Sequence, residues 1–109
     1  MVHTEDQLNQ VIAEYVTKTV DRIPQVEEIW LFGSHIHGTP HEDSDIDLAV
    51  VSPLFADDFP AALGAMYLTL WKMENRAIIE IHGFTREDFD ADLLGEEVRR
   101  TGKKIYPIV

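Results

Sequence analysis

The sequence predicts an α+β fold, a single domain spanning residues 1–109, in which helices and short strands alternate. In some segments apolar residues recur at three- and four-residue spacing, as on one face of a helix. Other segments are short apolar runs rich in β-branched and aromatic residues, as in strands, and proline or glycine separates one segment from the next. Hydrophobic residues make up 45% of the chain, which is enough for a packed core and argues against general disorder.

Residues 5–20 are the first predicted helix, because their apolar residues fall on one face. Thr4 and Gln7 fit a capping box at its start, and Pro24 prevents its continuation. That face consists of Leu8, Val11, Ile12, Tyr15, Val16 and Val20.

The next two elements are strands. The run VEEIWLF at residues 26–32 is apolar with a β-branched and aromatic bias. The run DIDLAVVS at residues 45–52 is similar and ends at Pro53. We expect Trp30, within the first run, to pack in the core rather than stack on a base, because its neighbours are apolar.

A second helix is predicted from about residue 58 to 74, with Pro60 in its first turn. Its apolar stripe is Leu63, Met66, Tyr67 and Leu70. Trp71 lies next to this stripe and is a candidate for a protein interface. The run AIIEIHGF at residues 77–84 predicts the third strand.

The last helix is predicted between Thr85, which resembles a cap, and Gly102, which resembles a stop, with Leu94 and Val98 facing inward. The tail KIYPIV, residues 104–109, predicts an edge strand, a place where its proline is tolerated.

Acidic residues inside these strands suggest a cation site. Side chains alternate along a strand, so Asp45 and Asp47 point the same way, and Glu80 stands apart from its apolar neighbours in the third strand. If the third strand lies beside the second, the three carboxylates form a cluster that suits Mg²⁺, Mn²⁺ or Ca²⁺. A solvated strand face is the alternative interpretation of the two aspartates.

A glycine–serine bend follows the first strand. Gly33 permits a tight turn, and the hydroxyl of Ser34 with the free backbone N–H groups suits a phosphate. A phosphate site beside paired acids is what metal-assisted transfer from a nucleoside triphosphate requires.

The spacing of these residues resembles a known family. Gly33 and Ser34, ten intervening residues, and then Asp45-Ile46-Asp47 are similar to the nucleotidyltransferase superfamily that includes DNA polymerase β, and specifically to its minimal nucleotidyltransferases. The resemblance is close over residues 26–84. It implies a mixed sheet of three to four strands flanked by helices.

The same resemblance implies the parts of the site. Asp45, Asp47 and Glu80 would be the catalytic, metal-binding residues for two Mg²⁺ ions, with Mn²⁺ as an alternative. Gly33 and Ser34 would hold the β- and γ-phosphates of ATP or another nucleoside triphosphate. The family usually has aspartate at the position of Glu80, and this departure leaves its role as general base open.

The resemblance also implies a partner. Minimal nucleotidyltransferases are often paired with a toxin of the HEPN type, and the expected activity is transfer of AMP to a hydroxyl of that protein. Two alternatives remain: a binding module that neutralises a toxin by occlusion, and a transferase for a small-molecule hydroxyl. Homo- or hetero-oligomers are both compatible with the sequence.

Charge and composition limit other functions. With 20 acidic and 9 basic residues the net charge is −11, which disfavours direct binding to nucleic acid or to anionic membranes. The chain has no cysteine, and neither a signal peptide nor a membrane-spanning run is evident, so we expect a cytoplasmic protein.

The histidines and a few basic residues are weaker candidates. Three histidines fall in the loop before the second strand, and His82 shares the predicted face of Glu80, which makes it the best candidate for a supporting role. The loop histidines are His35, His37 and His41. Candidates to neutralise triphosphate charge are Lys72, Arg76 and Arg86.

Overall fold

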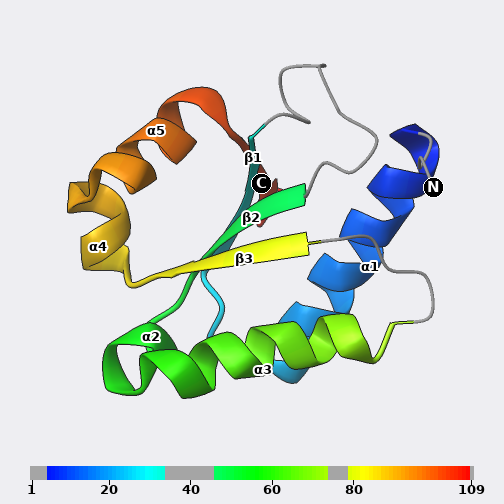
Figure 1. Ribbon diagram of the computed structural model, residues 1–109, viewed down its shortest axis with the longest axis horizontal. Helices are drawn as coiled ribbons and strands as arrows, with labels where there is room; N and C mark the ends of the chain where they lie inside the picture. The colour runs from blue at the N-terminus through cyan, green and yellow to red at the C-terminus, as the bar shows by residue number, and fades with distance from the viewer. Residues whose placement is uncertain (1–4, 34–45, 74–78, 109) are drawn as a thin grey trace.

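The computed structural model describes residues 5–33, 46–73 and 79–108 (Figure 1). The helices are α1 (Glu5–Arg22), α2 (Leu54–Asp57), α3 (Phe59–Trp71), α4 (Arg86–Ala91) and α5 (Leu93–Thr101). The strands are β1 (Glu28–Phe32), β2 (Ile46–Val51), β3 (Ile79–Phe84) and β4 (Lys103–Tyr106). Among the helices in this described part, none is long and apolar enough to cross a membrane.

The four strands form one mixed sheet in the order β3-β2-β1-β4. Strand β2 runs parallel to β3, whereas β1 is antiparallel to both β2 and β4. The parallel pair is joined through α2 and α3, the kind of crossover that parallel strands need. The α+β class, the mixed sheet and the edge strand at the C-terminal tail are therefore confirmed.

Helices cover the sheet on both faces (Figure 1). On one face, α1 and α3 pack over Ile46, Leu48 and Val50 to make the larger core. On the other, α4 and α5 contribute Phe89 and Val98 to a smaller core. Alternation along β2 supplies both layers, since Ala49 and Val51 belong to the smaller core.

Two aspartates start helices in the structure. The helix predicted from about 58 to 74 is confirmed as α3, and Asp58 caps its start in an extended conformation, accepting a hydrogen bond from the Ala61 N–H at 3.0 Å. The short helix α2 before it was not predicted. The segment from Thr85 to Gly102, predicted as one helix, is broken at Asp92, whose carboxylate caps α5. Each aspartate competes for backbone N–H groups and starts a new helix.

The break at Asp92 also corrects the prediction for Leu94. We expected Leu94 to face inward with Val98, but Leu94 is exposed whereas Val98 is fully buried. The new helical start changes which residues of α5 face the sheet. The predicted ends of the segment are confirmed, because the Thr85 hydroxyl accepts from the Asp88 N–H and α5 ends before Gly102.

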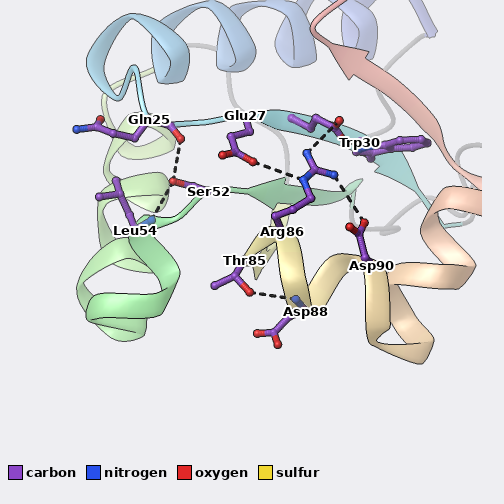
Figure 2. A network of polar contacts seen from close by, with 10 residues as sticks. Gln25, Glu27, Trp30, Ser52, Leu54, Thr85, Arg86, Asp88 and Asp90 are labelled. Atoms are coloured by element: carbon purple, nitrogen blue, oxygen red, sulfur yellow. Dashed lines mark hydrogen bonds and ion pairs between the residues drawn. The ribbon is translucent and has the colours of Figure 1, made fainter.

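An ion-pair network joins α4 to β1 (Figure 2). The Arg86 guanidinium lies 3.1 Å from Glu28, 3.5 Å from Glu27 and 3.8 Å from Asp90. Partial burial lowers the pKa of Arg86, but the hydrogen bond and charge of Glu28, with the charges of Asp90 and Glu27, raise it overall. The network holds α4 against the end of β1 that lies furthest from Phe32.

Tyr15 connects α1 to α3 from within the larger core. Its side chain is fully buried, and its hydroxyl donates to the Met66 carbonyl at 2.9 Å. Burial raises the pKa of Tyr15 well above its usual value because the charged phenolate would lie in an apolar environment. The neutral phenol is thus favoured in the folded state more than in the unfolded state.

We expect the substitution Tyr15→Phe to flatten the alkaline part of the stability profile. Because the folded pKa is raised, the stabilisation by the Tyr15 proton is complete below about pH 10 and falls as the pH rises further, at up to about 1.4 kcal/mol per pH unit. At pH 7 the variant should lose about 1 kcal/mol through the missing hydrogen bond. Urea unfolding of both proteins at pH values from about 8 to about 11.5 measures this, and parallel profiles would contradict it.

Candidate active site

Two acidic side chains meet where β2 and β3 pair. In the parallel register Asp47 stands opposite Glu80, and both point to the face that carries α4 and α5. His82, two residues further along β3, places its Nε2 atom 3.3 Å from Asp47 Oδ1 and 3.8 Å from Glu80 Oε1. One ligand atom from each of these three residues lies within 4.8 Å of the others.

The cluster lies on the part of this face that the helices leave open. Further along the same face, Ala49, Val51 and Phe84 are buried beneath α4 and α5. By contrast, the exposed fractions of the side chains are 24% for Asp47, 26% for His82 and 52% for Glu80. The face is thus divided into a covered apolar half and an open polar half.

Gly33 packs directly against the Asp47 carboxylate. It follows β1, whose last residue, Phe32, pairs with Asp47, and its φ of 92° lies in the left-handed region that favours glycine. A Cβ atom at this position would collide with Asp47 Oδ2 and lie 3.3 Å from its Cγ. The bend after β1 therefore contacts one of the acidic residues.

Two neighbours hold His82 in place. Its ring packs edge-on against Phe32 with the ring centroids 5.1 Å apart, and its Nε2 atom is within hydrogen-bonding distance of Asp47. On the other side of β3, the Ile81 N–H donates to the Tyr67 hydroxyl at 3.0 Å. These contacts fix the strand segment that carries Glu80.

Several predicted site residues lie outside the described residues. They are Ser34, Asp45, the loop histidines His35, His37 and His41, and Arg76. Their roles remain predictions. The structure brings together Gly33, Asp47 and Glu80, and it adds His82.

Arg86 is not placed to neutralise a triphosphate at this cluster. It is the first residue of α4, two positions after the last residue of β3, whereas Glu80 is the second residue of that strand, so nearly the length of the strand separates them. Its guanidinium also contacts three carboxylates that do not belong to the cluster (Figure 2). Lys72 ends α3, which packs on the opposite face of the sheet.

Trp30 is similarly committed to the fold. Its ring packs against Phe89 at a centroid distance of 5.8 Å, and its indole N–H donates to Glu28 at 2.8 Å. The expectation that Trp30 packs in a core rather than on a base agrees with these contacts. Trp71, in contrast, is 69% exposed.

The chemistry of the cluster fits a divalent cation. Like charges directly opposite each other on neighbouring strands are destabilising. Among the described residues, no lysine or arginine forms an ion pair with Asp47 or Glu80, and only His82 lies within ion-pair distance. Carboxylate oxygens suit Mg²⁺ or Mn²⁺, and the imidazole adds a nitrogen ligand that transition metals accept.

Paired carboxylates suit a divalent cation, and backbone N–H groups at a bend suit an anion such as phosphate. The model of the nucleotidyltransferase domain family matches residues 12–101 of this chain. The chain belongs to this family.

Individual relatives agree with this assignment. A segment of 32 residues is 53% identical to the protein adenylyltransferase MntA of Shewanella oneidensis, and it spans 29% of this chain but only 23% of that protein. A candidate nucleotidyltransferase from Sulfolobus solfataricus has the same fold, with a TM-score of 0.65 at 19% identity over 93% of this chain and 81% of its own. The structure of a mutant of the toxin–antitoxin MntA–HpeT has a TM-score of 0.55 at 24% identity. The match covers 82% of this chain and 68% of that chain.

We expect Gly33→Ala to damage both stability and the cluster. The alanine Cβ would be strained at this φ and would displace the Asp47 carboxylate, at a cost of about 1–3 kcal/mol. Thermal unfolding should show a Tm about 5–15 °C lower, and Mn²⁺ affinity, measured by electron paramagnetic resonance, should fall. The matched control is Gly64→Ala, because a Cβ there meets no atom within 4 Å. An unchanged Mn²⁺ affinity in Gly33→Ala would contradict the packing argument.

We expect Asp47→Asn to separate stability from metal binding. Removing one of two opposed charges should stabilise the metal-free protein by about 0.2–1 kcal/mol, while Mn²⁺ affinity falls by about tenfold or more. Thermal unfolding with and without Mn²⁺ measures both effects. Glu87→Gln, which removes an exposed acid on α4, should leave the Mn²⁺ affinity unchanged. Equal Mn²⁺ affinities for Asp47→Asn and Glu87→Gln would refute the assignment.

Proposed function

We propose that this chain is a metal-dependent nucleotidyltransferase that transfers AMP from ATP to a hydroxyl of a partner protein. The observation that carries the proposal is the pairing of Asp47 with Glu80 in register, against the Gly33 bend. Membership of the nucleotidyltransferase domain family supports the reaction type.

In the proposed site, Asp47 and Glu80, with Asp45, hold Mg²⁺ ions. When bound, the ions neutralise charge on the phosphates and on the attacking oxygen. Gly33 and Ser34 bind the β- and γ-phosphates through backbone N–H groups and the serine hydroxyl. The close contact of Gly33 with Asp47 supports this arrangement, because the glycine after β1 lies beside one carboxylate of the acidic pair.

The proposed reaction is a single displacement at the α-phosphorus. The acceptor oxygen forms a bond to that phosphorus while the bond from phosphorus to the oxygen bridging to the β-phosphate breaks, and pyrophosphate leaves. Glu80, whose side chain is half exposed at the open end of the face, accepts the hydroxyl proton. His82 hydrogen-bonds to Asp47 and keeps that carboxylate oriented.

The proposed acceptor is a tyrosine of a HEPN-type toxin, with this chain as its antitoxin. Local identity to the protein adenylyltransferase MntA supports protein as the acceptor class, and the MntA–HpeT structure shares this fold. The matched segment, which is 53% identical, spans 23% of MntA. The net charge of −11 also favours a basic partner, such as an RNA-binding toxin.

The test is label transfer to the protein encoded next to this chain. With ATP labelled on the α-phosphate and Mg²⁺, the wild type should label that protein, and ATP labelled on the γ-phosphate should give no label. Variants Asp47→Asn and Asp45→Asn/Asp47→Asn should lose at least about 99% of the transfer, as expected when metal ligands of a phosphoryl-transfer site are removed. Glu87→Gln is the matched acidic control and should transfer normally.

The same assay, together with a test of cell protection, distinguishes an active transferase from an inactive binding module. If the double Asn variant still protects cells from the toxin, and the wild type transfers no label, the chain neutralises by occlusion. Transfer at equal rates by wild type and double variant would exclude this cluster as the active site. Label on a small-molecule hydroxyl instead of on protein would show that the acceptor is a small molecule.

A further inference from the structure

The outer side of α3 is an apolar surface on the edge of the molecule (Figure 1). From Phe59 to Trp71 the helix carries no charged residue, although charged residues make up 27% of the chain. Its inner side is buried in the larger core. Its outer side lines a shallow groove whose residues include Pro60, Ala61, Gly64, Tyr67, Leu68 and Trp71. We call these six residues the α3 surface.

Gly64, at the middle of this surface, relieves no steric contact with the described residues. At each of the other described glycines, an added Cβ would press against a neighbour, as at Gly83 against Phe55 and at Gly95 against the Phe89 carbonyl. At Gly64 it would meet nothing within 4 Å. Glycine is unfavourable inside a helix compared with alanine, so its presence here costs stability without relieving any contact in the described structure.

A glycine on an exposed helix face permits close approach by another helix. The exposed fractions of its neighbours are 69% for Trp71 and 37% for Leu68, so large apolar side chains flank the open position. Ridges of one helix then fit beside the missing side chain of the other. The α3 surface thus has the shape of one half of a helix pair.

The charges at the two ends of α3 favour a second copy of the same helix as the partner. Asp57 and Asp58 precede the helix and Lys72 follows it, all of them exposed. Among the described residues, none of the three forms an ion pair. Two copies of α3 packed antiparallel place the acidic end of each helix against the lysine of the other.

We propose that a second copy of this chain docks on the α3 surface, with the two helices antiparallel across a two-fold axis at Gly64. Such an interface is self-complementary, because each copy supplies both the acid and the base of two equivalent ion pairs. Trp71 of each copy then covers the first turn of the other, where Pro60 and Ala61 leave room. The contact is small for a protein interface, so the dimer is weak and depends on concentration.

This inference is independent of the proposed catalytic function. The α3 helix packs on the face of the sheet opposite to the one that carries Asp47 and Glu80. A variant at Gly64, which contacts no part of the site, should therefore leave Mn²⁺ binding and label transfer unchanged, and failure of one proposal does not entail failure of the other.

Sedimentation equilibrium of the full chain tests the pairing, from about 10 µM to about 1 mM, the range in which a weak interface saturates. The wild-type mass should rise from 12.5 kDa toward twice that value. Gly64→Glu should stay at 12.5 kDa throughout, since it places a charge at the two-fold axis. Ala13→Glu, which adds the same charge at an exposed position of α1, should dimerise like the wild type.

A charge exchange tests the orientation and the identity of the partner. Asp57→Lys and Lys72→Glu should each weaken dimerisation by about threefold or more, because each brings like charges together. The double variant Asp57→Lys/Lys72→Glu should recover the wild-type dissociation constant, since both ion pairs reform with reversed sign.

Three results would overturn the proposal. A wild-type protein that is monomeric at the highest concentration excludes self-pairing. It does so also where a different helical protein binds to that monomer and the substitution Gly64→Glu abolishes the binding. A dimer that Gly64→Glu leaves intact excludes the α3 surface. A double charge variant that is no better than either single variant excludes the antiparallel arrangement.

Discussion

The parallel pairing of β2 with β3 places Asp47 opposite Glu80, and the candidate site depends on this register. The register is maintained by apolar residues on the other face, where Ile46 pairs with Ile79 and Leu48 with Ile81. Burial of each such side chain contributes about 1.5–3 kcal/mol, whereas opposed like charges cost about 0.2–1 kcal/mol. The core therefore holds the carboxylates together against their repulsion. A shift of one strand by one residue would turn its carboxylate to the opposite face and separate the pair.

The extent of α4 and α5 decides how much of the opposite face stays open. Phe89 is buried against Phe84 and Trp30, and the Arg99 guanidinium lies over its ring, 5.8 Å from the centroid. Arg86 ties this helical layer to the distant end of β1. The layer thus covers the apolar end of β2 and β3 and leaves the acidic end partly exposed to solvent.

The molecule separates its chemistry from its proposed assembly. The acidic cluster occupies one face of the sheet, and the uncharged α3 helix covers the other. The net charge of −11 would oppose both the approach of the proposed triphosphate and the approach of a second copy. In the two proposals, a divalent cation at the cluster would offset the first repulsion, and apolar contact with matched charges at the helix ends would offset the second.

The sequence alone determined the elements and the side on which their residues point, because periodicity and capping are local properties. Alternation predicted that Glu80 and His82 share a face, and proline and glycine marked most element ends. Local pattern also carried the signal at Asp92, where an aspartate cap interrupts the helix predicted from Thr85 to Gly102, although the strength of the cap against helical periodicity could not be judged beforehand.

Only the tertiary structure decided which strands are neighbours, in which direction they run and in which register. Strand order, direction and register depend on how segments distant in the sequence pack together, and a local sequence pattern does not contain that information. The contact of Gly33 with Asp47, the position of His82 between two carboxylates and the commitment of Arg86 to β1 all follow from it. Only the tertiary structure shows that a Cβ at Gly64 would meet no atom within 4 Å. From the sequence alone, this glycine could equally have been needed for close packing against a neighbouring residue.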